Sequence, residues 1–153
     1  GRRIGVLFAS QVNEYARLVP FDESSRAQMA LGNVSALLAN RISWLFDLLG
    51  PSEAIDTACS GSLVAVHRAV QILRANEAEM VLAGGVSVML SPDSEETVRK
   101  LGVASPDNRC FVFDSRANGY VKGEGVGAVL LKPLENALAD GNPVLAVIRG
   151  SAV

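Results

Sequence analysis

The sequence predicts an α/β fold in which helices pack against a largely buried sheet. Short, continuous apolar runs, such as residues 4–9 and 80–83, have the length and composition of strands that are covered on both faces. Stretches with apolar residues at helical spacing lie between these runs. Strands that alternate with helices favour right-handed crossovers and a layered arrangement, and 153 residues are enough for about one domain.

Apolar runs of strand length recur along the whole chain. The predicted strands cover residues 4–9, 54–55, 80–83, 86–90, 128–131 and 144–153. Gly84-Gly85 is expected to break the strand that begins at Met80. The glycine-dense segment 119–127 is expected to be irregular and to lead into the strand at residues 128–131.

The predicted helices lie between the strands and carry recognisable end signals. They cover residues 33–49, 60–76, 92–102 and 134–140, and residues 10–28 form a polar, irregular loop. Asn33 is expected to cap the first helix, which Gly50-Pro51 ends. Ser91 followed by Pro92 and acidic residues is typical of a helix start.

Composition excludes several classes of function. The net charge of −2 gives no reason to expect a nucleic acid or an anionic membrane as partner. No apolar run approaches the roughly 18 residues of a spanning helix, and no signal peptide opens the chain. Cys59 and Cys110 are the only cysteines and histidines do not cluster, so neither a metal site nor a disulfide scaffold is expected. A reduced, cytoplasmic setting follows.

Cys59 lies in a small-residue turn between the second predicted strand and the helix over residues 60–76. A strand-to-helix turn presents a nucleophile above a sheet, and the positive end of a helix dipole favours a thiolate. The small Ala58, Ser60 and Gly61 leave room for a large group to reach the sulfur. These residues alone leave two interpretations open, a reactive nucleophile and a small buried hydrophobe.

The motif around this cysteine identifies a family. Residues 56–63 (D-T-A-C-S-G-S-L) resemble the active-site motif of the β-ketoacyl synthases, commonly D-T-A-C-S-S-S-L, and Gly61 is the only departure. Four further resemblances follow in the family's order. The first two are N-R-I-S at 40–43 with G-P-S at 50–52, and A-G-G-V at 83–86. The last two are N-R-C at 108–110 with F-D at 113–114, and G-Y-V-K-G-E-G at 119–125. Asn108 and Asn118 replace the family's glycine and aspartate. Residues 129–134 and 147–153 are most similar to modular type I polyketide synthases, and among these to the trans-acyltransferase type.

The resemblance implies a thiolase-like fold, in which two pseudo-symmetric α/β halves form five layers, usually in a homodimer. Residues 1–153 would hold the later part of the first half and the start of the second. Both ends of the chain lie in apolar, strand-like runs. We therefore expect a fragment of a single ketosynthase domain that is truncated at both ends.

The resemblance also implies decarboxylative Claisen condensation in polyketide biosynthesis. Cys59 would accept the growing acyl chain as a thioester from an acyl carrier protein, and a carrier-bound malonyl unit would then lose carbon dioxide and attack that thioester. No cofactor is expected beyond the phosphopantetheine that carries these acyl and malonyl thioesters. The backbone N–H of Cys59 is expected to be one donor to the tetrahedral intermediate.

Other candidate residues are expected to be structural. The family's two catalytic histidines come from H-G-T-G-T and G-H motifs that are missing here, so the chain alone should be inactive. His67 lies eight residues after Cys59 on one predicted helix, about 12 Å away, which is too far for proton transfer. Cys110 matches a structural position of the family. Glu124 is expected to be a hydrogen-bonded structural acid rather than an active-site carboxylate, and Asp56 to anchor the turn.

Two other enzymatic interpretations stay open at this point. One is a fatty-acid condensing enzyme or another acyltransferase of the thiolase superfamily. The other is a non-elongating ketosynthase that only holds or transfers the acyl chain. A non-enzymatic scaffold is disfavoured because the nucleophile motif is almost intact.

Overall fold

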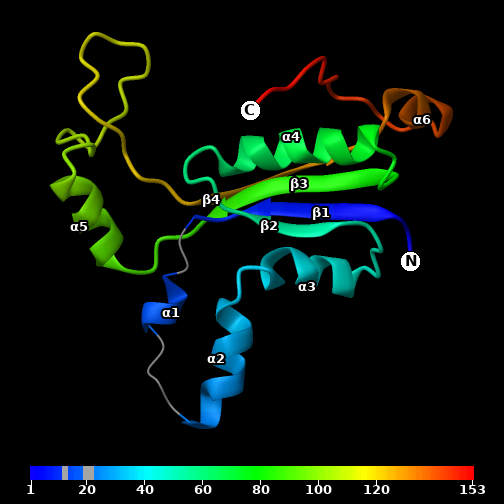
Figure 1. Cartoon of the computed structure of the whole chain (residues 1–153). Helices are drawn as coiled ribbons and strands as arrows, with labels where there is room; N and C mark the ends of the chain where they lie inside the picture. The colour runs from blue at the N-terminus through cyan, green and yellow to red at the C-terminus, as the bar shows by residue number, and fades with distance from the viewer. Residues whose placement is uncertain (12–13, 19–22) are drawn as a thin grey trace.

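A four-stranded mixed sheet with the order β2-β1-β3-β4 forms the centre of the computed structural model (Figure 1). The structure describes residues 1–11, 14–18 and 23–153. The strands are β1 (Ile4–Ala9), β2 (Ser52–Ile55), β3 (Met80–Ser87) and β4 (Gly125–Leu131). The helices are α1 (Tyr15–Leu18), α2 (Arg26–Asn33), α3 (Leu37–Leu45), α4 (Gly61–Arg74), α5 (Pro92–Lys100) and α6 (Leu134–Ala139), and a 3-10 turn covers Glu23–Ser25.

Helices α4 and α3 cover opposite faces of the sheet and make three layers (Figure 1). Strand β1 pairs in parallel with both β2 and β3, so it is the middle one of the three parallel strands. Because successive side chains of a strand point to opposite faces, Leu7 packs beneath α4 while Val6 and Phe8 pack on the α3 side. The alternation explains why β1 is one continuous apolar run, as predicted for a strand covered on both faces.

Helix α4 buries a narrow stripe of small and apolar residues against β1 and β3. Ala65, Ala69 and Ile72 recur at spacings of four and three residues, and all three are fully buried. The helix lies close to the sheet where β3 passes beneath it, because a Cβ added at Gly85 would lie 2.9 Å from the Cβ of Ser62. The predicted break at Gly84-Gly85 is therefore wrong. These glycines lie inside β3 and permit close packing.

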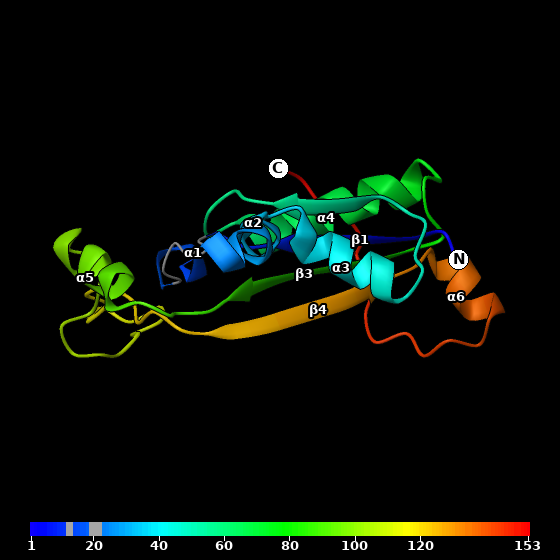
Figure 2. The same cartoon turned by 90° about the horizontal axis from the view of Figure 1, so that it is seen from below.

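Strand β4 departs from the largely buried sheet that the sequence predicts. It pairs antiparallel with β3 and lies at an edge of the sheet (Figure 2). Six of its seven residues are exposed, since α3 packs on β1 and β2 and α4 on β1, β2 and β3. The prediction of a strand is confirmed, but the prediction of a largely buried sheet does not hold at β4.

The helix predicted over residues 33–49 is wrong at both ends. Asn33 ends α2 instead of capping a new helix, and its Nδ2 donates a hydrogen bond to the carbonyl of Met29 at 2.7 Å. An extended Val34 separates α2 from α3, which ends at Leu45, before Asp47 takes a positive φ of 51°. The predicted loop over residues 10–28 contains α1 and the start of α2, and its residues 12–13 and 19–22 lie outside the described part of the chain.

The strand predicted at residues 144–153 is also wrong. This segment forms no ladder with the four strands of the sheet, and Leu145 is 99% exposed. An apolar run becomes a strand only where its backbone lies alongside a strand edge and pairs with it. The segment instead returns over α4 (Figure 1), where the hydroxyl of Ser151 lies 3.0 Å from Nδ1 of His67.

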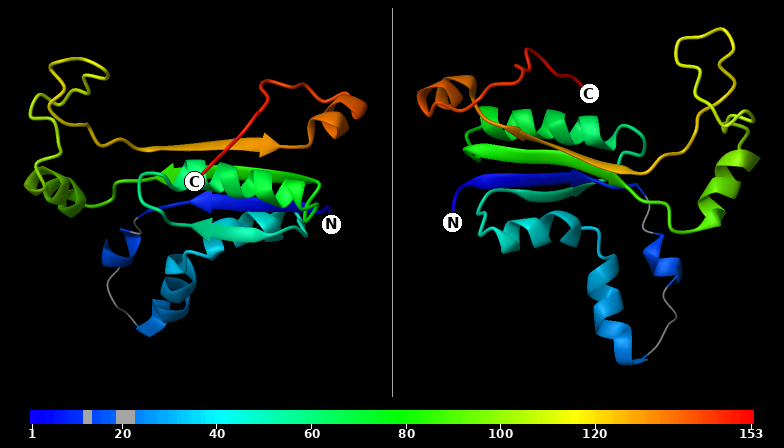
Figure 3. Two further views of the ribbon diagram at one scale, coloured as in Figure 1. Left: turned by 45° about the horizontal axis from the view of Figure 1, so that its top comes forward. Right: turned by 180° about the vertical axis from the view of Figure 1, so that it is seen from behind.

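Two other predictions that rest on local signals are confirmed. Strand β1 has the predicted bounds, and the Ser91 side chain accepts a hydrogen bond from the N–H of Asp93 at the start of α5. Helix α5 and the loop that follows it extend beyond the carboxyl ends of the parallel strands (Figure 3). No helix among the described residues is long and apolar enough to cross a membrane.

Glu53 of β2 and Arg68 of α4 form a bidentate ion pair that joins the sheet to the helix. Nη2 of Arg68 lies 3.0 Å from Oε1 of Glu53, and Nε lies 3.2 Å from Oε2. Because both side chains are about one-third exposed, Glu53→Gln is expected to lower the unfolding free energy by only about 0.5–1 kcal/mol. Urea denaturation at low and at 1 M salt checks this, since salt should shrink the loss.

Glu95→Gln is the matched control for that measurement, because its pair with Arg99 is about two-thirds exposed and 3.6 Å long. An equal loss of unfolding free energy in both variants would contradict the role of the Glu53–Arg68 pair in joining sheet and helix. A loss in Glu53→Gln that does not change with salt would contradict it too.

Candidate functional site

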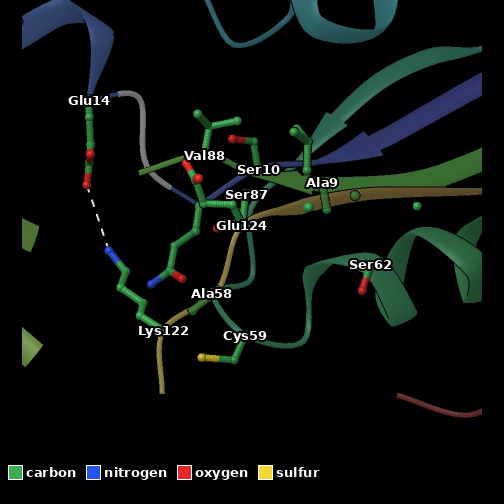
Figure 4. Close-up of a pocket in the computed structure, with 16 residues that line it drawn as sticks. Ala9, Ser10, Glu14, Ala58, Cys59, Ser62, Ser87, Val88, Lys122 and Glu124 are labelled. Carbon is green, nitrogen blue, oxygen red and sulfur yellow. Dashed lines mark ion pairs between the residues drawn. The ribbon is translucent and has the colours of Figure 1, made fainter. Parts of the chain in front are cut away.

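A pocket of about 450 Å³ opens at the carboxyl edge of the parallel strands (Figure 4). Its walls come from the end of β1, the end of β3, the turn after β2 and the segment that precedes β4. Cys59 from the turn and Lys122 from the segment before β4 both line it. Ligands of open α/β sheets bind at this edge, because the loops that follow the strands converge there.

The turn that carries Cys59 is held by side chains of its own residues. Oδ1 of Asp56 accepts the N–H of Ala58 at 3.0 Å, so Asp56 anchors the turn as predicted. The hydroxyl of Ser60 donates to the carbonyl of Thr57 at 2.8 Å. Ala58 takes a positive φ of 53°, which is strained for a residue with a Cβ. This sharp bend leaves the thiol of Cys59 exposed at the pocket.

Gly61 lets the first turn of α4 lie directly on the end of β1. It is buried, and a Cβ added there would lie 2.9 Å from the Cβ of Ala9. Cys59 comes two residues before this first helical residue. Its position is therefore close to the positive end of a 14-residue helix, where negative charge is favoured.

Glu14 is a buried residue of the site that the sequence analysis missed. It is 3% exposed, and its Oε2 accepts the N–H groups of Leu90 at 2.6 Å and Ser91 at 2.8 Å. Its Oε1 lies 3.8 Å from Nζ of Lys122, which donates to Oγ of Ser94 at 2.6 Å. Nothing in the sequence distinguishes Glu14 from other loop acids, since its partners lie more than 70 residues away.

These neighbours lower the pKa of Glu14 from 4.5 to about 2. The largest cause is the hydrogen bond from the Ser94 side chain, followed by the Ser91 and Leu90 amides, and the charge of Lys122 adds to them. Because the folded-state pKa is below the unfolded value, the stabilisation by ionised Glu14 is complete above about pH 4.5 and is lost as the pH falls towards 2.

The difference in unfolding free energy between the wild type and Glu14→Gln should therefore be constant from about pH 5 to 7 and shrink below pH 4.5. Urea denaturation of both proteins at several pH values between 3 and 7 measures it. A difference that stays constant down to pH 3 would contradict the lowered pKa.

Glu124 is hydrogen-bonded, as predicted, but it is not buried. Its Oε1 accepts the N–H of Met89 at 2.6 Å, and its exposed side chain lines the same pocket as Cys59. Glu14 and Glu124 thus bind three consecutive backbone N–H groups, those of residues 89–91.

His67 and Cys110 are not among the residues that line the pocket. Nε2 of His67 lies 2.8 Å from Nε2 of Gln71 on the next turn of α4. The Sγ of Cys110 accepts the N–H of Val121 at 3.1 Å in the loop before β4. The described residues include no group of three or more histidine, cysteine or acidic side chains that could hold a metal ion.

Comparisons with known sequences agree with one another. Residues 1–137 match the family described as "Beta-ketoacyl synthase, N-terminal domain". The chain is 49% identical to a highly reducing polyketide synthase of Aspergillus calidoustus, over 100% of this chain and 6% of that protein. It is 47% identical to a phenolphthiocerol/phthiocerol polyketide synthase of Mycobacterium tuberculosis, over 100% of this chain and 10% of that protein. The chain thus spans a tenth or less of these relatives.

Solved structures share the fold. The ketosynthase from module 6 of the bacillaene synthase of Bacillus subtilis 168 superposes with a TM-score of 0.82 at 42% identity, over 91% of this chain and 23% of that one. The oxazolomycin ketosynthase domain of Streptomyces albus JA3453 gives a TM-score of 0.83 at 39% identity, over 96% of this chain and 26% of that one. The described fold therefore recurs in larger chains.

Proposed function

Because this chain belongs to the β-ketoacyl synthases and has the thiolase-like α/β fold of solved ketosynthase domains, we propose that it is part of a longer polyketide ketosynthase in which Cys59 accepts an acyl chain. The observation that carries the proposal is the exposed thiol of Cys59, which lies in a pocket at the strand-to-helix turn. All the relatives named above are polyketide synthases or their ketosynthases, which favours polyketide over fatty-acid chemistry.

Acyl loading is a thioester exchange. The sulfur of Cys59 attacks the thioester carbonyl carbon of an acyl carrier protein and forms a new C–S bond. The tetrahedral oxyanion then collapses, the old C–S bond breaks, and the carrier leaves as a thiolate, which takes up the proton that the Cys59 thiol has released. The N–H of Cys59 is our candidate for one donor to that oxyanion.

Elongation follows from the loaded state. A carrier-bound malonyl unit loses carbon dioxide, and its enolate carbon attacks the acyl thioester and displaces Cys59 as a thiolate. We expect the residues that assist decarboxylation to lie outside these 153 residues, so the chain alone should not condense. We also propose a homodimer for the complete domain, and the sequence of residues 129–134 and 147–153 favours the trans-acyltransferase type.

A two-step assay of the full-length protein tests this function. Acyl-loaded carrier protein is added first, and malonyl-loaded carrier protein second, with mass spectrometry of the carrier-bound products. The proposal predicts an acylated enzyme and then a β-ketoacyl product two carbons longer. An acylated enzyme without this product would instead establish the non-elongating alternative, and no acylation would overturn the function.

A further inference from the structure

Residues 88–91 connect β3 to α5 without regular secondary structure, and the first of them, Val88, lines the pocket. Strand β3 ends at Ser87 and α5 begins at Pro92, so these residues have neither a ladder nor a helix to fix them. Their N–H groups bind side chains instead. Met89 donates to Glu124, while Leu90 and Ser91 donate to Glu14. Hydrogen bonds to an ionised acceptor are about twice as strong as neutral ones. The two carboxylates therefore hold these backbone N–H groups in place where no β-ladder does.

Lys122 joins the two carboxylate-bearing segments. Its Nζ donates to Ser94 of α5 at 2.6 Å and lies 3.8 Å from Oε1 of Glu14. It is two residues before Glu124, so the Glu14–Lys122 pair fixes the segment that carries Glu124 as well. The Glu14 side chain is only 2% exposed and that of Lys122 25%, so solvent screens this pair much less than a surface pair.

This network lies on the same pocket as the nucleophile. Glu14, Lys122, Glu124 and Cys59 all line it, and Figure 4 shows the Glu14–Lys122 pair beside the pocket. We propose that Glu14, paired with Lys122, is a positioning residue for acyl transfer: by holding residues 89–91 and Lys122 it fixes the pocket wall at Val88 and residues 122–125, so that an acyl thioester meets the sulfur of Cys59 in reacting geometry. The inference rests on the function proposed above.

The proposal predicts a specific kinetic effect in the full-length protein. In Glu14→Gln the amide oxygen can still accept the Leu90 and Ser91 N–H groups, but its NH₂ group then faces the ammonium of Lys122. A misplacement of about 1 Å is worth up to about 100-fold in rate, so we expect acyl transfer to Cys59 to slow about tenfold. Lys122→Met should slow it equally, and Lys122→Arg should retain most of the rate.

The double variant Glu14→Gln/Lys122→Met should be no slower than either single variant, because both remove one interaction. Glu96→Gln is the matched control, since this acid pairs with Lys100 on the exposed side of α5, and its rate should equal that of the wild type. Alkylation of Cys59 by iodoacetamide is the second readout. This small reagent needs no pocket wall, so its rate should stay within about twofold, whereas general unfolding would change both rates.

Amide hydrogen exchange at residues 89–91 completes the test. The proposal predicts faster exchange there in Glu14→Gln together with slower acyl transfer. Faster exchange at residues 89–91 with an unchanged acyl-transfer rate would overturn the positioning role. The role would also be overturned if the rates of acylation and of iodoacetamide alkylation of Cys59 changed by the same factor. If the wild type is not acylated at all, the proposed function fails and the positioning role fails with it. Unchanged exchange would show separately that Glu14 does not fix this wall.

Discussion

Replacing Cys59 with alanine is expected to abolish acyl loading of the full-length protein, while Cys110→Ala should load within about twofold of the wild type. Cys59 is exposed on the pocket at the strand-to-helix turn, whereas Cys110 lies in the loop before β4 and is absent from the lining. Removing a nucleophile leaves no covalent route, so the expected loss is at least about 1,000-fold. Transfer of a radiolabelled acyl group from its carrier protein measures it.

The thermal midpoint of each variant is the control for that experiment, since neither thiol is buried and both proteins should fold. Loading that persists in Cys59→Ala and disappears in Cys110→Ala would contradict the assignment of the nucleophile.

Gly61→Ser, which would restore the common form of the family motif, is expected to lower both the stability and the acyl-loading rate. A Cβ there would lie 2.9 Å from the Cβ of Ala9, closer than real Cβ contacts, so α4 must move away from β1. Overpacking of this kind costs about 1–3 kcal/mol of unfolding free energy. Because Cys59 lies two residues earlier, Gly61→Ser should also slow acyl loading about tenfold or more.

A compensating change at Ala9 sharpens this test. Ala9→Gly removes the opposing methyl group, and glycine in a strand should cost only about 0.5–1 kcal/mol by itself. The double variant Ala9→Gly/Gly61→Ser should therefore recover most of the loading rate that Gly61→Ser loses. Chemical denaturation and acyl-loading rates of the wild type, the two single variants and the double variant form a double-mutant cycle. A double variant as slow as Gly61→Ser would show that the clash with Ala9 is not the cause.

The parts of the site that depend on neighbouring residues could be predicted from the sequence. The strand before Cys59, the helix after it and the anchoring role of Asp56 all follow from short-range patterns, and the structure confirms each. The helix start at Ser91 is a further local signal that is confirmed.

The parts that depend on distant partners could not be predicted. The pairing of β4 with β3 and the burial of Glu14 involve residues far apart in the chain, and no local pattern reports them. Gly84-Gly85 shows a related difficulty, because a glycine that ends a strand and a glycine that permits close packing look alike in the sequence. Residues 144–153 have a strand-like composition but do not join the sheet in this structure.

The most direct test of the central claim is to locate the acyl group itself. The full-length protein is mixed with an acyl-loaded carrier protein, quenched at low pH and digested, and peptide mass spectrometry finds the modified residue. The acyl mass on Cys59 is the predicted result. The same mass on Cys110, or no acylated peptide although the carrier protein is consumed, would contradict it.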